Sequence, residues 1–201
     1  MLCDGLDADL RSDGIAVRDR FLTARQVRAL IACAGKRRER GEFEAARIGA
    51  DRTLQRRTDI RGDSIRWLTE PLFAPERELE ESLEQLRLQL NRDALLGLFE
   101  LEMHYAWYAP GAGYARHVDQ PRFRGRRRVS LVLYLNQRWK AADGGQLRIY
   151  ADDGRHRDIE PVAGRLVIFL TERREHAVLP TQCGRLSLTG WFRGRERLPL
   201  R

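Results

Sequence analysis

The segment Leu101-Glu-Met-His-Tyr-Ala-Trp-Tyr108 decides the fold of this chain. Its apolar residues stand at alternate positions, and a period of two predicts a β-strand with one face against a core. The other face carries Glu102, His104 and Tyr108, which would either line a wet pocket or face solvent. The alternation alone is compatible with both placements.

More short β runs follow this segment, and turn residues separate them. The runs are Val129 to Leu135, Gln146 to Tyr150, Arg165 to Leu170 and Leu186 to Phe192, and the breaks are Gly111, Gly113, Gly144-Gly145, Asp152-Asp153-Gly154 and Gly164. Many short strands with such breaks are typical of an antiparallel barrel or a double-sheet jelly roll. The sequence therefore predicts a mainly β core.

The first half of the chain has the pattern of helices that flank one or two strands. Thr23 is expected to cap a helix running to about Ala34, and a second helix is expected from Ala74-Pro75 to about Asn91. Their apolar stripes would cover one outer face of the sheet. These stripes consist of Val27, Leu30 and Ile31 in the first helix and Leu79, Leu83, Leu86 and Leu90 in the second.

Two further segments complete the first half, with a short strand at 14–17 and a polar, basic loop and strand at 46–67. The fold class expected is thus mainly β with flanking helices, an α+β protein. We expect one structural domain, in which residues 1–95 pack on a core formed by residues 96–201.

The composition is that of a single globular domain with a basic net charge. The chain has 201 residues, of which 42% are hydrophobic and 33% charged, which is too apolar for a disordered protein. The formal net charge of +8 and the sequence pI near 10.1 favour acidic partners such as nucleic acid or a ribonucleoprotein surface. The excess arginine is dispersed along the chain, so a solvated basic surface is the preferred explanation, and the charge is weak evidence for a nucleic-acid-binding face.

The sequence also predicts where the protein is found. Its first residues lack the basic start and apolar stretch of a secretory signal, and no segment approaches the length of a membrane span. Three scattered cysteines without a CxxC pair suit a reducing compartment. We therefore expect a cytoplasmic protein without a membrane partner.

His117-Val-Asp119 places an imidazole and a carboxylate two residues apart. On an extended segment both side chains share a face and can reach one ion. Two imidazoles and one carboxylate, with open positions left, form the ligand set of iron(II) in oxygenases. His176 is the candidate for the third ligand, because it follows an expected strand by only a few residues. For the pair alone, the favoured interpretation is a surface histidine and an aspartate that forms a turn before Pro121.

The last expected strand supplies a candidate for binding an anion. Leu186, Leu188 and Phe192 lie on one of its faces, and Arg185 lies on the other with Ser187, Thr189 and Trp191. A buried arginine needs an anionic partner, and its planar fork suits a carboxylate. Arg185 could thus hold the far end of a dicarboxylate whose other end chelates the metal. An exposed arginine on a half-solvated strand is the alternative.

Several short motifs follow one another from about Leu101 to Arg193. They are Tyr108-Ala-Pro-Gly-Ala-Gly-Tyr-Ala-Arg-His117-Val-Asp119, Leu133-Tyr-Leu-Asn136, Trp139, Gly144-Gly-Gln-Leu-Arg-Ile149, Asp158-Ile-Glu-Pro161, Arg165-Leu-Val-Ile-Phe169, Glu172-Arg-Arg-Glu-His176-Ala-Val178-Leu-Pro180 and Arg185-Leu-Ser-Leu-Thr-Gly-Trp-Phe192. This region resembles the prolyl 4-hydroxylase-like branch of the 2-oxoglutarate and iron(II) oxygenases, especially oxygen-sensing prolyl hydroxylases and their bacterial relatives. The first half matches chiefly at Asp59-Ile-Arg-Gly-Asp63.

The resemblance implies a double-stranded β-helix core of the cupin-like jelly-roll type. It implies His117, Asp119 and His176 as iron ligands and Arg185 on the outer carboxylate of 2-oxoglutarate. Tyr134 would donate to the same carboxylate. The remaining pocket positions implied by the resemblance are Tyr108, Val132, Leu147, Val178, Thr189 and Trp191.

This chain departs from the animal enzymes at two places. His104 stands where they carry an apolar residue, and the segment from Tyr108 to His117 is one residue shorter. The role of His104 is therefore not given by the resemblance.

The resemblance also implies the reaction and its cofactors. Oxidative decarboxylation of 2-oxoglutarate, with iron(II), O2 and ascorbate as an additional cofactor, would be coupled to hydroxylation of a prolyl residue in a protein substrate. A nucleic-acid demethylase of the same superfamily is the second interpretation, but that branch has an arginine six residues after the co-substrate arginine, where this chain has Trp191. A non-catalytic jelly-roll binding module is the third.

Overall fold

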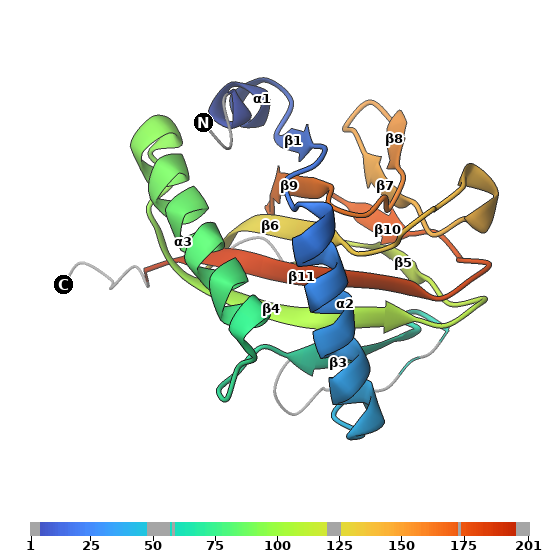
Figure 1. The fold of residues 1–201 in the computed structure, drawn as a ribbon. Coiled ribbons are helices and arrows are strands. Elements are labelled where there is room, and N and C mark those ends of the chain that lie inside the picture. Colours follow the sequence, from blue (N-terminus) through green and yellow to red (C-terminus); the bar gives the residue numbers. More distant parts are fainter. Residues whose placement is uncertain (1–4, 48–56, 58, 120–125, 173, 196–201) are drawn as a thin grey trace.

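Two antiparallel β-sheets form the body of the protein in the computed structural model, which describes residues 5–47, 57, 59–119, 126–172 and 174–195 (Figure 1). The strands are β1 Ile15–Arg18, β2 Glu44–Ala45, β3 Asp63–Trp67, β4 Leu98–Tyr108, β5 Tyr114–His117, β6 Arg127–Tyr134, β7 Leu147–Tyr150, β8 His156–Ile159, β9 Leu166–Leu170, β10 His176–Val178 and β11 Arg185–Gly194. The helices are α1 Leu6–Ser12, α2 Ala24–Glu39 and α3 Ala74–Ala94, with a 3-10 turn at Ala141–Asp143.

The larger sheet has the strand order β1-β9-β6-β11-β4-β3-β2, and the smaller sheet has the order β5-β10-β7-β8. Strands that are neighbours in space are mostly far apart in sequence, as expected when the chain crosses repeatedly between two sheets. This is the double-sheet jelly roll that the short alternating runs predict.

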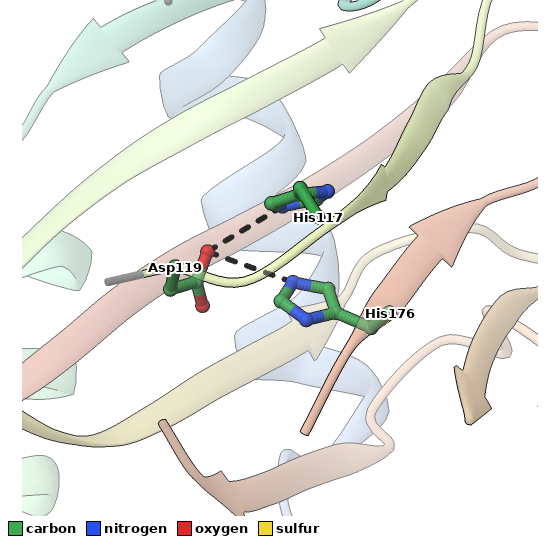
Figure 2. A group of neighbouring side chains, drawn as sticks. All are labelled: His117, Asp119 and His176. Carbon is green, nitrogen blue, oxygen red and sulfur yellow. Dashed lines mark ion pairs between the residues drawn. The ribbon is translucent and has the colours of Figure 1, made fainter. Parts of the chain in front are cut away.

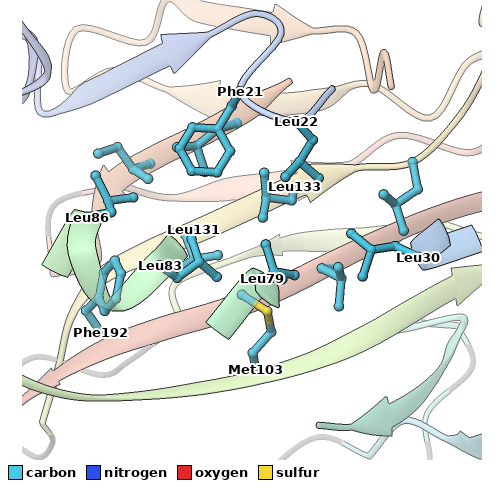
Figure 3. Close-up of a cluster of buried hydrophobic side chains, with 14 of the residues drawn as sticks. Phe21, Leu22, Leu30, Leu79, Leu83, Leu86, Met103, Leu131, Leu133 and Phe192 are labelled. Carbon is cyan, nitrogen blue, oxygen red and sulfur yellow. The ribbon is translucent and has the colours of Figure 1, made fainter. Parts of the chain in front are cut away.

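Helices α2 and α3 cover the outer face of the larger sheet (Figure 1). Thr23 caps α2 as predicted, because its hydroxyl accepts from the backbone N–H of Gln26 and the Gln26 side chain accepts from the backbone N–H of Thr23. The leucine stripe of α3 is buried against β4, β6 and β11 (Figure 3). None of the described helices is long and apolar enough to cross a membrane.

Strand β11 lies between β4 and β6 and separates the helix-facing core from the interior between the sheets. Leu186, Leu188 and Phe192 belong to the core beneath the helices, as predicted from the sequence. The other face of β11 carries Arg185, which pairs across the sheet with Tyr108 of β4. The face of β4 that carries His104, Ala106 and Tyr108 therefore lines the interior between the sheets rather than bulk solvent.

A close backbone approach fixes where β5 begins. A Cβ on Gly113 would lie 2.7 Å from the carbonyl oxygen of Val178 in β10, closer than real Cβ contacts allow. Only glycine permits this contact. The approach presses the loop before β5 against β10, and the short strand that follows carries His117.

The described residues differ from the sequence predictions mainly in short elements. The first half contributes three strands to the larger sheet instead of one or two, and α1 was not predicted. The predicted helix ending near Ala34 continues to Glu39. Much of the predicted 46–67 segment lies outside the described residues, but β3 is its predicted strand. The division of the chain at residue 95 stays a prediction. Strands from both sides of that position join one sheet.

A buried ion pair joins α2 to the start of α3. Arg37 donates to both carboxylate oxygens of Glu76, at 2.8 and 2.6 Å, and also to Glu42 at 2.7 Å. Burial alone would raise the pKa of Glu76, but hydrogen bonds from Arg37 and from the backbone N–H of Phe73 outweigh it and hold that pKa below its ordinary value. Glu76 is therefore ionised and holds the two helices together.

We expect Glu76→Gln to destabilise the protein by about 3 kcal/mol, because the substitution leaves Arg37 buried with one charge partner fewer. Since the pKa of Glu76 is lowered on folding, the native protein should lose stability as the pH falls through the acid range, and the variant should lose less. Urea denaturation measures both effects. Glu84→Gln, which breaks an exposed pair with Arg87, should change stability by less than about 1 kcal/mol. Equal effects of the two substitutions would contradict this account.

Candidate metal and co-substrate site

Three predicted metal ligands meet at one end of the space between the sheets (Figure 2). His117 ends β5 and pairs directly with His176, the first residue of β10, while Asp119 lies two residues beyond β5. The Oδ1 atom of Asp119 lies 3.5 Å from the Nε2 atom of each histidine. The candidate ligand atoms all lie within 4.8 Å of one another, so they can surround one ion.

Backbone carbonyls orient both imidazoles. His117 Nδ1 lies 2.8 Å from the carbonyl oxygen of Ala115, and His176 Nδ1 lies 3.1 Å from that of Arg174. Because a carbonyl only accepts, each Nδ1 carries the proton and each Nε2 presents a lone pair. A metal-binding histidine needs this tautomer and this support.

The carboxylate is oriented in the same way. Ser130 of β6 donates from its hydroxyl to the Oδ2 atom of Asp119 at 2.6 Å, and its oxygen lies 3.0 Å from the hydroxyl of Thr171. This contact leaves Oδ1 directed at the two histidines. The aspartate is thus fixed by the larger sheet and the histidines by the smaller one.

The charge state of the cluster suits a divalent cation. Burial would raise the pKa of Asp119, but His176 and His117 outweigh it and hold that pKa well below its usual range. Burial lowers the pKa of His117, whereas Asp119 outweighs burial at His176 and raises its pKa. Two imidazoles and one carboxylate are the donor set of non-haem iron(II) centres, so these residues fit that ion.

Arg185 lies deep in the same interior and is only 1% exposed. Its Nε donates to the carbonyl of Gly145 at 2.9 Å and an Nη to the Ser187 hydroxyl at 3.2 Å. Its Cζ lies 5.0 Å from the ring centre of Tyr108 and 5.2 Å from that of Tyr134. Among the described residues no carboxylate forms an ion pair with Arg185, so its charge suits an anionic ligand.

Tyr134 supplies a second donor beside Arg185. Its hydroxyl is buried and makes no hydrogen bond within the described part of the chain. Burial raises the pKa of Tyr134 to about 12, so the phenol keeps its proton at neutral pH. A guanidinium and a phenol side by side would hold one carboxylate of a dicarboxylate such as 2-oxoglutarate.

One cavity is lined by the predicted site residues other than Tyr134, whose ring centre lies 5.2 Å from the Cζ atom of Arg185. The predicted residues that line it are His117, Asp119, His176, Arg185, Tyr108, Val132, Leu147, Val178, Thr189 and Trp191. The structure therefore brings together residues that span more than seventy positions of sequence, while their roles as ligands and walls stay predictions.

The cavity also has a wall that sequence reasoning missed. Arg61 is paired with Asp63 at 2.7 Å and lies over the ring of Tyr114, which stacks on His117 with ring centres 3.6 Å apart. Arg61 and Asp63 come from the segment just before and at the start of β3, far from the main motifs. The isolated Asp59-Ile-Arg-Gly-Asp63 match was the one signal that could have located them.

The comparisons with known proteins agree with this geometry. Residues 103–193 match the family described as the 2OG-Fe(II) oxygenase superfamily. The chain is 33% identical over 200 residues to human Egl nine homolog 1, covering 91% of this chain and 44% of that protein, and 31% identical over 173 residues to human prolyl hydroxylase EGLN3, covering 80% and 67%. The chain spans about half the length of the Egl nine homolog 1 relatives.

Solved structures show the same fold over nearly the whole chain. A Pseudomonas putida prolyl-4-hydroxylase superposes with a TM-score of 0.86 at 44% identity, covering 95% of this chain and 98% of that one. A Trichoplax adhaerens prolyl hydroxylase, solved with a hypoxia inducible factor peptide, has a TM-score of 0.85 at 27% identity, covering 94% and 87%.

A jelly roll with a His-Asp-His cluster and a buried arginine defines an iron and 2-oxoglutarate oxygenase. The chain belongs to the 2-oxoglutarate and iron(II) oxygenase superfamily, whose cofactors are Fe(II), 2-oxoglutarate and O2. Iron held by these three residues would supply the activation of oxygen that hydroxylation of a C–H bond requires. The chain's own residues would orient the two ligands, neutralise the outer carboxylate and exclude water.

We expect His176→Ala to lower the affinity for Mn(II), used as a redox-stable substitute for iron(II), at least a hundredfold, because one of three ligands is lost. Isothermal titration calorimetry measures the affinity, and circular dichroism should show an unchanged fold. His156→Ala is the matched control, since His156 is exposed on β8, which strand β7 separates from β10, and His156 is not part of the cluster. Full metal affinity in the His176 variant would disprove the ligand assignment.

Proposed function

We propose that this protein hydroxylates a prolyl residue of a protein or peptide substrate, using Fe(II), 2-oxoglutarate and O2. The observation that carries the proposal is the 44% identity to a solved prolyl-4-hydroxylase over 95% of the chain, with the whole candidate site inside the matched fold. Relatives named as prolyl hydroxylases, and the Trichoplax enzyme solved with a peptide, support the same substrate class.

In this proposal the roles of the cavity residues follow from their chemistry. His117, Asp119 and His176 hold the iron, and Arg185 with Tyr134 holds the outer carboxylate of 2-oxoglutarate. The walls limit the space around the co-substrate and keep water out. These wall residues are Tyr108, Val132, Leu147, Val178, Thr189 and Trp191.

The cavity also suits a prolyl ring. Trp67 is 39% exposed, and its ring centre lies 6.3 Å from that of Trp191 in the cavity wall. Flat aromatic faces of this kind pack well against the saturated carbons of a pyrrolidine ring. Because Trp191 lines the same cavity as the three candidate metal ligands, a proline against these rings would lie at that cavity.

A nucleic-acid demethylase is the rival function, and the charge around the cavity does not favour it. Arg61 is paired with Asp63, and Arg127 is paired with Glu102 at 2.6 Å while lying over the ring of Trp191. Paired guanidiniums attract phosphates less than unpaired ones. Residues 48–56, 58 and 120–125, which include several more arginines, lie outside the described residues. A non-catalytic binding module would not require a His-Asp-His cluster in the same cavity as Arg185.

Two further features belong to the proposal. A cytoplasmic location is supported by Cys33 and Cys183, both of which are unpaired thiols. Ascorbate would act as a reductant that keeps the iron in its ferrous state. The division into an N-terminal part, 1–95, and a catalytic core, 96–201, is proposed on the position of the matched family region.

The test is turnover of 2-oxoglutarate with iron(II) against two substrate panels. The first holds blocked heptapeptides with a central proline and randomised flanks, and the second holds methylated oligonucleotides. We expect succinate release that depends on peptides, with mass spectrometry locating one added oxygen atom on proline.

The same panel made with pipecolic acid or alanine in place of proline is the control, and we expect no oxygen on its central residue. Demethylation of oligonucleotides, or peptide-dependent succinate without oxidised proline, would overturn the prolyl assignment while leaving the oxygenase class intact.

A further inference from the structure

His104 of β4 is a buried polar side chain without a function in the site described so far. It is 1% exposed, and neither of its ring nitrogens has a hydrogen-bond partner among the described residues. Burying such a group without a partner costs on the order of 1–3 kcal/mol. Buried polar groups in native proteins are nearly always satisfied, so this histidine is expected to meet its partner in a ligand.

His104 faces the cavity at the end that holds the metal ligands. It shares the inner face of β4 with Tyr108, which lies opposite Arg185, but it stands four residues earlier in the strand and opposite Thr189. The next inward position of β11 is Trp191, whose partner on β6 is Ser130.

Ser130 is the residue that donates to Asp119. His104 is therefore near the Asp119 end of the cavity and remote from the Arg185 end. An oxygen or amide held by His104 would lie close to the metal ligands and away from the guanidinium.

Two tryptophans flank the imidazole and connect it to the protein surface. The ring centre of His104 lies 4.7 Å from that of Trp67 and 5.5 Å from that of Trp191. The indole N–H of Trp191 is also buried and unpartnered in the described part of the chain. Because Trp67 is partly exposed, the cluster runs from the surface to the cavity and offers unused hydrogen-bonding atoms along the way.

The imidazole of His104 offers one donor and one acceptor. Burial, together with the nearby charges of Arg61 and Arg127, lowers the pKa of His104 to about 3, so the ring is neutral in physiological conditions. A neutral imidazole has one N–H and one bare nitrogen. A dicarboxylate presents acceptors only and would leave the bare nitrogen unsatisfied. A peptide backbone presents both C=O and N–H groups and can satisfy both atoms.

We propose that His104, with the indole N–H of Trp191, binds the backbone of the polypeptide substrate beside the target residue and so positions it at the metal end of the cavity. This inference rests on the proposed prolyl-peptide function and adds a residue to it. His104 is a positioning residue that hydrogen-bonds to the peptide without entering the chemistry.

The test uses the full chain loaded with Zn(II) and 2-oxoglutarate, and the peptide that is hydroxylated fastest in the heptapeptide panel. We expect His104→Leu to weaken peptide binding about tenfold, the loss that one or two buried hydrogen bonds produce. His104→Gln, which keeps a donor and an acceptor, should recover most of the affinity. His156→Gln, on the exposed strand β8, is the control and should bind the peptide as the unaltered chain does.

Two readouts separate substrate binding from a structural role. With ¹⁵N-labelled histidine, of which the chain has four, the ring nitrogens of His104 should shift when the peptide is added and stay in place when 2-oxoglutarate alone is added. The ligand-free His104→Leu variant should have an unchanged or higher melting temperature, because an unsatisfied buried group is removed.

Each result has a distinct meaning. A ring-nitrogen shift with 2-oxoglutarate alone would assign His104 to the co-substrate and overturn the inference. Peptide binding unaffected in His104→Leu, or a lower melting temperature with equal loss in the glutamine variant, would make His104 a packing residue and also overturn it. If the unaltered chain binds no prolyl peptide, the proposed function falls and this inference falls with it.

Discussion

The antiparallel pairing of β5 with β10 is the constraint on which the rest of the site depends. It sets His117 directly opposite His176, two residues separated by nearly sixty positions of sequence, and it brings Asp119 within reach of both. Neither strand is long enough to be stable alone. The pairing exists because β7 and the loop at Gly113 hold β10 and β5 in place on either side.

The two sheets contribute different residues to the site. The smaller sheet supplies the histidines, whereas the larger sheet supplies Arg185 and the serine that orients Asp119. An ion held between them therefore links the sheets. Because helices α2 and α3 cover only the outer face of the larger sheet, the inner face stays available for polar side chains.

Buried polar groups occur in this protein in three situations with different consequences. Arg37 and Glu76 satisfy each other and join two helices. Arg185 has neutral hydrogen-bond partners but no carboxylate among the described residues, which fits a ligand anion. His104 has no hydrogen-bond partner among the described residues. The pair that supports the fold is fully satisfied, whereas the two buried groups at the cavity lack partners that a ligand can supply. At the cavity, stability is therefore given up for function.

Much of the fold could be predicted from the sequence because apolar residues recur at regular spacing along the long strands and helices. The two faces of β4 and β11, and the leucine stripe of α3, follow directly from alternation and helical spacing. The strands β8 and β10 were missed because runs of three or four residues carry no readable period, and their partners decide whether they form.

The candidate site divides in the same way. The His-x-Asp pair and Arg185 were predicted from residue type, spacing and a family resemblance. The wall formed by Arg61 and Asp63 was missed because its position follows from β3 pairing with β4, a contact between distant segments that no local pattern encodes.

A crystal structure of the chain grown without oxygen, with Mn(II) and 2-oxoglutarate, tests the central claim most directly. The account predicts an anomalous peak for manganese between His117, Asp119 and His176, and the outer carboxylate of 2-oxoglutarate on Arg185 and Tyr134. Manganese bound elsewhere, or a carboxylate that does not reach Arg185, would contradict it.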